Sequence, residues 1–151
     1  MEGNEHRDDV QAIEAVIARQ FASVSWTPGT SADWDGFAAD FFPAASLYPA
    51  ARPAKRQPVE AFIERMKGLV GTKLRSFEEV VLGTEIRVFG NVAVALAACE
   101  ITENGSEVNR GVEMLILIKD AGAWQIVSQA WDTESPSQPI PMRLLGRPTG
   151  E

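Results

Sequence analysis

Apolar residues in the first half of the chain recur at intervals of three and four, which is the spacing of amphipathic helices. The first series predicts a helix over residues 9–25, with an aspartate available to cap its first turn. A shorter series after Asp33 predicts a second helix that ends at Pro43, and a third begins at Pro58. The segment ASLYP between the last two indicates a brief strand.

From residue 74 onward the pattern changes to the alternation that is typical of a β-sheet. Four runs follow one another at 75–89, 91–103, 106–120 and 123–133, separated by the short breaks FGN, NG and AG. Asn-Gly is a strong signal for a two-residue hairpin, so neighbouring runs are expected to pair antiparallel. Helices followed by strands predict the α+β class, here three helices packed on a curved antiparallel sheet.

The two faces of this sheet can be assigned if the Asn-Gly and Ala-Gly loops each contain two residues. Met114 then lies opposite Gln129, on the same face as Trp131 and Arg110. That face also has small side chains at alternate positions over 95–99, which leaves volume beneath the helices. We therefore expect a cavity there, lined by apolar side chains and a few polar groups, as in many small-molecule sites.

The expected cavity gives seven candidate ligand-binding residues. They are Trp26, Trp34, Tyr48, Arg110, Met114, Gln129 and Trp131. Other interpretations stay open, because Trp131 could be core, Gln129 could bond to backbone or water at the rim, and Tyr48 could be a packed aromatic. If Arg110 is buried, it needs an anionic or carbonyl partner, either in a ligand or in an internal acid such as Asp35 or Asp40.

The opposite face of the predicted sheet is also apolar, above all in the run MLILI at 114–118. A solvated face would alternate between apolar and polar residues, so a second copy of the chain is expected to cover it in a homodimer. The candidates for this dimer face are Leu115, Leu117, Trp124 and Ile126. The alternative is an ordinary antiparallel strand with some exposed leucine.

Composition narrows the classes of partner. With 14 Lys and Arg against 21 Asp and Glu, a net charge of −7 makes nucleic acid an improbable partner. The single Cys99 and the single His6 exclude disulfide frameworks, Cys/His zinc sites and Ser-His pairs built away from the amino terminus. We expect no metal and no cofactor, with Cys99 buried and inert and with Glu100, Glu113 and Asp132 solvated.

The chain is expected to form one domain over 9–133, with a flexible segment at 1–8 and a Pro-rich arm at 134–151. No apolar run approaches the roughly 18 residues that span a bilayer, and the start MEGNEHRDD lacks the features of a signal peptide. We therefore expect no membrane partner and a cytoplasmic location.

The segments FAADFFPAASLYP and GAWQIVSQAWD, with the order of the elements, resemble the nuclear-transport-factor-2-like superfamily. That superfamily includes SnoaL-like polyketide cyclases and ketosteroid isomerases. The resemblance implies a cone of three helices closing a strongly bent sheet around an apolar cavity, with dimers formed through the outer face of the sheet. The positions that resemble the isomerase catalytic residues hold Phe21, Pro49 and either Met114 or Leu115, so isomerase chemistry of that kind is not expected.

The sequence supports three hypotheses of function. The first is a small-molecule-binding domain whose cavity is gated by the three aromatic candidates before residue 50 and anchored by Arg110 and Gln129. Its ligand would be a small apolar molecule or one that bears a carboxylate or carbonyl. The second is an isomerase, cyclase or hydratase for a polyketide-like or steroid-like carbonyl compound, with Tyr48 as donor and Asp35 or Asp40 as base. The third is a homodimeric association module.

Overall fold

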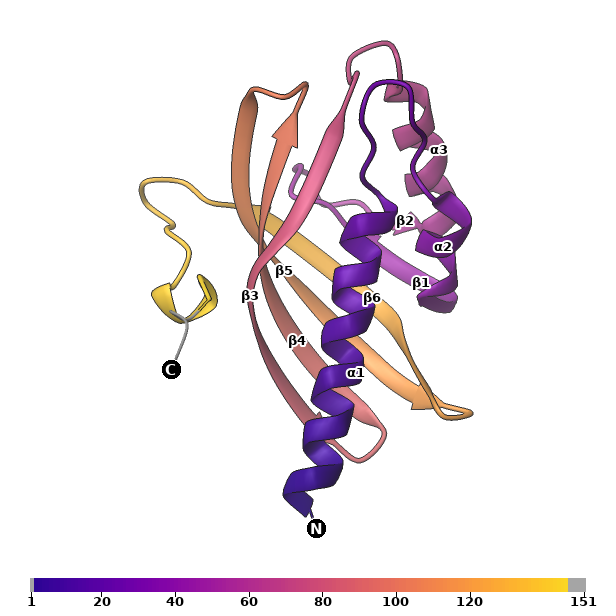
Figure 1. The fold of residues 1–151 in the computed structure, drawn as a ribbon, viewed down its shortest axis with the longest axis vertical. Helices are drawn as coiled ribbons and strands as arrows, with labels where there is room; N and C mark the ends of the chain where they lie inside the picture. Colours follow the sequence, from indigo (N-terminus) through magenta and orange to yellow (C-terminus); the bar gives the residue numbers. More distant parts are fainter. Residues whose placement is uncertain (1, 147–151) are drawn as a thin grey trace.

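The long first helix, α1 (Glu2–Ser23), lies across one face of a six-stranded sheet in the computed structural model, which describes residues 2–146 (Figure 1). Its apolar stripe faces the sheet, and Ile13 and Ile17 in this stripe are fully buried. The helix begins well before the predicted start at residue 9. Residues 2–8, which we expected to be flexible, form its first turns.

Two shorter helices complete the layer above the sheet. α2 (Trp34–Ala39) starts after Asp33, whose side chain accepts a hydrogen bond from the Gly36 N–H at 2.9 Å. α3 (Val59–Leu69) starts after Pro58 and buries one apolar face. The three predicted helices are therefore present. Within the described residues, no helix is long and apolar enough to cross a membrane.

The sheet has the strand order β2-β1-β6-β5-β4-β3. Its four long strands pair antiparallel in succession and are β3 (Phe77–Phe89), β4 (Val92–Glu103), β5 (Glu107–Asp120) and β6 (Ala123–Thr133). β1 (Phe41–Tyr48) lies parallel to β6, and the short β2 (Gln57–Pro58) pairs with β1. The sheet is therefore mixed rather than purely antiparallel, because a long crossover separates β1 from β6. The predicted α+β class is confirmed.

The register between β4 and β5 differs by one residue from the predicted register. The loop between these strands contains three residues, 104–106, so Cys99 pairs with Gly111 instead of Arg110. The first two loop residues adopt positive φ angles of 55° and 75°. Because alternate side chains point to opposite faces, a shift of one residue moves every side chain of β5 to the other face.

A second irregularity, in the pairing of β5 with β6, reverses this shift for the last part of β6. The Ala121-Gly122 turn has the predicted two residues, but the register changes near the middle of the two strands. Beyond that bulge Leu115 pairs with Gln129, and both Gln129 and Trp131 lie on the face that the helices cover. Two departures from the predicted register thus cancel for these two residues.

The residues predicted for a dimer face lie in the core of the chain itself. They are Leu115, Leu117, Trp124 and Ile126, each at most 5% exposed. That assignment was wrong, because the shifted register turns these side chains toward the helices, where they join the main hydrophobic core. The outer face carries Met114 and Ile116 instead, and both are about half exposed.

The segment after β6 folds back over the outer face of the sheet (Figure 1). Ile140 and Leu144 are buried there beside Ala98, and Leu144 belongs to the short 3-10 helix η1 (Met142–Leu144). A Cβ atom at Gly83 would lie 2.4 Å from the Leu144 carbonyl oxygen, so glycine is needed for this approach. The predicted Pro-rich arm packs on the sheet as far as residue 146, and its last residues lie outside the described part.

Candidate functional site

A cavity of about 220 Å³ lies between the helices and the inner face of the sheet. Aromatic side chains from all three helices and from two strands contribute to its wall. They are Phe21, Phe37, Phe62, Phe77 and Trp131. The polar and charged side chains at the wall are Gln20, Arg65, Glu79, Glu103, Glu113 and Gln129. The cavity is therefore apolar over much of its surface but contains acidic groups.

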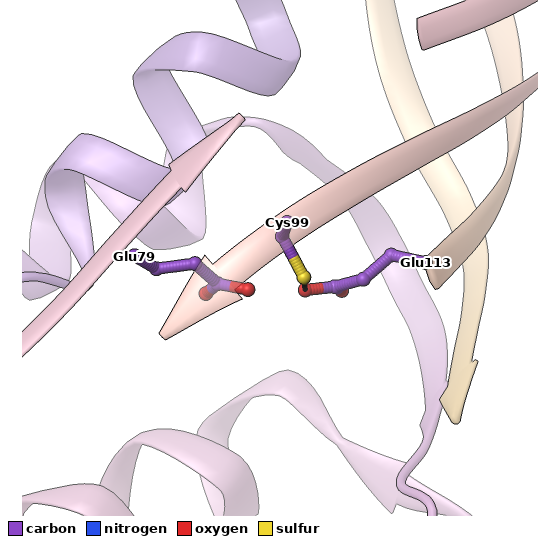
Figure 2. Close-up of side chains that lie close together, drawn as sticks. All are labelled: Glu79, Cys99 and Glu113. Carbon is purple, nitrogen blue, oxygen red and sulfur yellow. Dashed lines mark hydrogen bonds between the residues drawn. The ribbon is translucent and has the colours of Figure 1, made fainter. Parts of the chain in front are cut away.

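Two of these acids, Glu79 and Glu113, lie close together on either side of Cys99 (Figure 2). Glu79 is on β3, Cys99 is on β4 and Glu113 is on β5, and one side-chain atom of each lies within 4.8 Å of the other two. Cys99 pairs with Val81 and Gly111, so each glutamate is two residues along from a direct partner of Cys99 and shares its face. All three side chains are buried.

Glu113 is held by a chain of side-chain amides that reaches across the cavity wall. The Gln129 Nε2 group donates a hydrogen bond to Glu113 Oε1. Gln20 on α1 donates in turn to Gln129 Oε1 at 2.6 Å. Gln20 and Gln129 are themselves buried, which fixes the orientation of both amides and hence the position of the Glu113 carboxyl group.

Glu79 is held differently. Its backbone N–H donates to Ser25 Oγ at 2.9 Å, and that hydroxyl donates to the Phe21 carbonyl oxygen at 2.8 Å. These contacts place the backbone of β3 against the end of α1. The side-chain Oε2 atom of Glu79 is buried and has no hydrogen-bond partner. One carboxyl of the pair is therefore fixed by its neighbours, and the other retains an unused acceptor.

The pKa values of the two carboxyl groups are both raised, because burial disfavours the charged form and neither group forms an ion pair among the described residues. The charge of Glu113 raises the pKa of Glu79 further. Hydrogen bonds with Glu79, Gln129 and Cys99 offset part of the rise in the pKa of Glu113. The pair therefore keeps a proton to higher pH than an ordinary carboxyl group does.

Cys99 takes no part in this ionisation. Burial and then the neighbouring carboxyl groups raise the pKa of its thiol. Its Sγ atom donates weakly to the Gly111 carbonyl oxygen at 3.7 Å and to Glu113 Oε2 at 3.9 Å. The expectation that Cys99 is buried is confirmed, and an uncharged buried thiol is a poor nucleophile.

Together, the carboxyl pair presents a proton donor and a proton acceptor to a partly open, largely apolar cavity. Such a pair can hydrogen-bond the polar end of a ligand, and it meets the basic geometric requirement for general acid and base catalysis. A strongly perturbed carboxyl pair in a cavity is also a general indication of a functional site.

Of the seven residues predicted to bind a ligand, Gln129 and Trp131 line the cavity. Trp26 is buried in the core, where it stacks on Phe77 with ring centroids 5.7 Å apart, and it does not line the cavity. Trp34 packs beside Trp26 at 6.2 Å. Tyr48 is 38% exposed on β1. The three aromatic residues predicted to gate the cavity therefore do not line it.

Arg110 and Met114 lie on the outer face of the sheet, so their assignment to the cavity was wrong. The one-residue shift in register is the cause. Arg110 pairs with Glu100 at 2.9 Å rather than with a ligand or with Asp40. Asp40, which we considered as a catalytic base, is paired with Arg19 at 2.7 Å.

The sequence analysis missed Gln20, Glu79 and Glu113. Glu113 was expected to be solvated, yet it is 6% exposed. Glu113, Leu115 and Leu117 occupy alternate positions of one strand, so their side chains point to the same face. A glutamate in line with two apolar residues was the signal that the sequence offered. The wrong register concealed this signal, because it placed that series on the outer face.

No protein-family model matches this chain, and no curated protein matches its sequence. Solved structures do match. A protein of unknown function from Mycobacterium tuberculosis has a TM-score of 0.73 at 19% identity, covering 92% of this chain and 80% of its own. A protein from Novosphingobium aromaticivorans, provisionally named a scytalone dehydratase, has a TM-score of 0.69 at 14% identity, covering 99% and 98%.

An NTF2-like protein of unknown function from Silicibacter pomeroyi has a TM-score of 0.62 at 18% identity, covering 85% of this chain and 98% of its own. A cystatin-like protein of unknown function from Nostoc punctiforme has a TM-score of 0.65 at 14% identity, with coverage of 87% and 94%. At these identities the likeness concerns the fold. The chain therefore has the NTF2-like, cystatin-like α+β fold, which confirms the fold that the sequence resemblance implied.

Proposed function

We propose that this protein binds a small, largely apolar molecule in the cavity and that the Glu79–Glu113 pair holds the polar end of that molecule. The observation that carries this proposal is the pair itself: two buried carboxyl groups side by side with no ion-pair partner among the described residues. Such a pair costs stability, because burial penalises charge and leaves acceptors unused. A chain that required only a stable core would have no need of it.

The size and lining of the cavity support a small ligand. Pockets for drug-sized molecules typically occupy roughly 300–1,000 Å³, and this cavity is smaller, at about 220 Å³. Its aromatic wall is already organised, since Phe62 stacks on Phe37 at 5.4 Å and meets Trp131 edge-on at 5.9 Å. A flat or compact apolar body would fit against these rings.

The unequal carboxyl groups favour a second candidate, an enzyme that transfers a proton to or from a carbonyl or hydroxyl compound. One carboxyl group of the Glu79–Glu113 pair would act as the acid and the other as the base, in place of the Tyr48 and Asp35 or Asp40 of the sequence hypothesis. Isomerisation and dehydration are reactions of this class. The structural similarity to a protein provisionally named a scytalone dehydratase is compatible with this candidate but concerns that protein's fold.

The homodimer stays a prediction, with different residues. Its face would now be the outer side of the sheet, where Val94, Met114 and Ile116 are each about half exposed. A contact through this face would leave the cavity on the opposite side of the sheet unobstructed.

The proposed function is tested by thermal unfolding in the presence of a library of small neutral, cationic and anionic molecules. A ligand that binds the folded state raises the melting temperature. Ile101→Trp should abolish this rise, because Ile101 lines the cavity and a larger side chain would fill it. Val80→Trp is the matched control, since Val80 lies on β3 and is 51% exposed.

Native mass spectrometry of freshly purified protein, before and after denaturation, provides an independent readout of a retained molecule. The binding proposal is wrong if no compound raises the melting temperature of the wild type more than that of Ile101→Trp and if denaturation releases no bound molecule.

A further inference from the structure

We infer that the ligand of the cavity is a small organic cation, a protonated amine on an apolar body, whose ammonium group lies between Glu79 and Glu113. This inference rests on the proposed function, because it names the ligand class of the same cavity. It goes beyond that proposal in excluding neutral and anionic molecules as the preferred ligands.

Other buried or partly buried acids in the chain are paired with a cationic side chain. Asp40 is 5% exposed and is paired with Arg19 at 2.7 Å. Asp9 is partly buried and is paired with Lys119 at 3.0 Å. The fold thus supplies a cation to these acids, yet among the described residues neither carboxyl of the buried pair has one. A bound cation would supply the missing charge.

One oxygen of the pair lacks a hydrogen-bond donor. Glu79 Oε2 is buried and has no partner among the described residues, and Glu79 lines the cavity. The Oε2 atom of Glu113 accepts weakly from the Cys99 thiol at 3.9 Å. An ammonium group brings up to three donors and accepts none. A ligand carboxylate would instead add a further negative charge beside the pair and two further acceptors.

Aromatic side chains line the same cavity as the acidic pair. The faces of Phe and Trp rings attract cations, and aromatic residues combined with acids are a recognised way to bind ammonium groups. Phe62 already receives one cation in this structure, because the Arg65 guanidinium lies over its ring at 5.3 Å. Arg65 itself is exposed and makes no ion pair with Glu79 or Glu113.

Binding of an amine has a defined proton balance. In the empty protein burial raises the pKa of both carboxyl groups, so we expect the pair to retain a proton. An incoming R–NH₃⁺ replaces that proton, so up to one proton leaves for each amine bound and both carboxyl groups become carboxylates. The other titratable groups that line the cavity are Glu103 of β4 and Arg65 of α3, and the Cys99 thiol contacts Glu113.

The test compares matched probes that differ only in the polar group: benzylamine, 2-phenylethylamine and cyclohexylmethylamine, each with the corresponding alcohol. Isothermal titration calorimetry at pH 7 measures affinity, and repetition in phosphate and HEPES buffers measures the protons released. We expect the best amine to bind at least about tenfold more tightly than its alcohol, as for charge-assisted hydrogen bonds. The apparent enthalpy should depend on the buffer.

Glu79→Gln should reduce the preference for amine over alcohol to near unity and abolish the proton release. Glu100→Gln on the outer face is the control and should leave both unchanged, since Glu100 pairs with Arg110 away from the cavity. Trp131 lines both the cavity and a pocket on the outer face, so the probe is located by labelling the tryptophan indole nitrogens in the wild type and in Ile101→Trp, which fills only the cavity. The NMR signal of Trp131 should shift in the wild type and not in Ile101→Trp. The signal of Trp124, which is hydrogen-bonded to Asp9, should shift in neither protein.

If the alcohols bind as tightly as the amines at Trp131, the cation inference is wrong and the binding proposal stands. If amine binding releases no proton or survives Glu79→Gln unchanged, the inference is also wrong. If no probe shifts Trp131 at millimolar concentration and the library test is also negative, the inference and the proposed function fail together.

Discussion

Strands β4 and β5 carry acids on both faces, and these acids differ in their burial and in their partners. On the outer face Glu100 lies opposite Arg110, and the two side chains form an ion pair at 2.9 Å in partial contact with water. On the inner face Glu113 lies beside Glu79, and both are buried with no cationic partner within residues 2–146 as described. The first arrangement contributes little to stability and suggests no function. The second is costly to folding, and that cost is what directs attention to the cavity.

The largest loss of stability is expected at Leu115 on the inner face, in contrast to its neighbour Met114 on the outer face. Leu115→Asp places a charge in the core, where Leu115 is 2% exposed, and should cost at least about 4 kcal/mol of unfolding free energy or prevent folding. Met114→Asp, one residue earlier and 55% exposed, should cost less than about 1 kcal/mol. Urea unfolding measures both. Equal losses, or the reverse order, would contradict the register described here.

A smaller effect, of opposite sign, is expected for Glu79→Gln. The folded protein keeps a proton that the unfolded chain releases near the ordinary pKa of 4.5, so wild-type stability falls as the pH rises above that value. The substitution removes this loss, since glutamine has no charge. We expect a gain of about 1–3 kcal/mol at pH 7 and a flatter pH profile.

Urea unfolding at several pH values between 4 and 8 checks this prediction. Glu100→Gln on the outer face serves as the comparison and should show no such gain. Asp9 and Glu85, whose pKa values are lowered by their cationic partners and hydrogen bonds, act alike in wild type and variant, so the difference between the two proteins is the readout. A difference that does not grow with pH would contradict the prediction.

The amide chain should have an effect of about 1–2 kcal/mol. Gln20→Leu removes the donor to Gln129 Oε1 and leaves that buried oxygen without its partner. The released Gln129 amide should also hold Glu113 less firmly, so the affinity for a cavity ligand should fall together with stability. Unfolding and calorimetric titration measured on the same variant test this link. A loss of stability with unchanged affinity would show that Gln20 has only a structural role.

The smallest effect is expected on the outer face. Arg110→Ala breaks a partly exposed ion pair and should change stability by less than about 1 kcal/mol, an effect that salt screens further. Ligand affinity should not change. A marked loss of affinity would show that Arg110 contributes to ligand binding, and the two faces would then differ less in function.

The candidate site was predictable only in part, for reasons that particular residues illustrate. Gln129 and Trp131 were assigned to the cavity side because two errors in register cancelled at the end of β6. Glu113 was missed because the predicted hairpin had one residue too few, which placed it with the solvated acids. Glu79 lies on β3, where no assigned register linked it to Cys99 or to the other glutamate.

The sequence alone determined the elements and the class of fold. Helical spacing and two-residue alternation are local properties, so three helices, four long strands and their α+β arrangement followed from them. The tertiary structure decided which face each strand residue occupies. One extra loop residue at 104–106 and one bulge in the pairing of β5 with β6 set that choice, and both depend on packing against distant segments. The buried carboxyl pair exists only because of that choice.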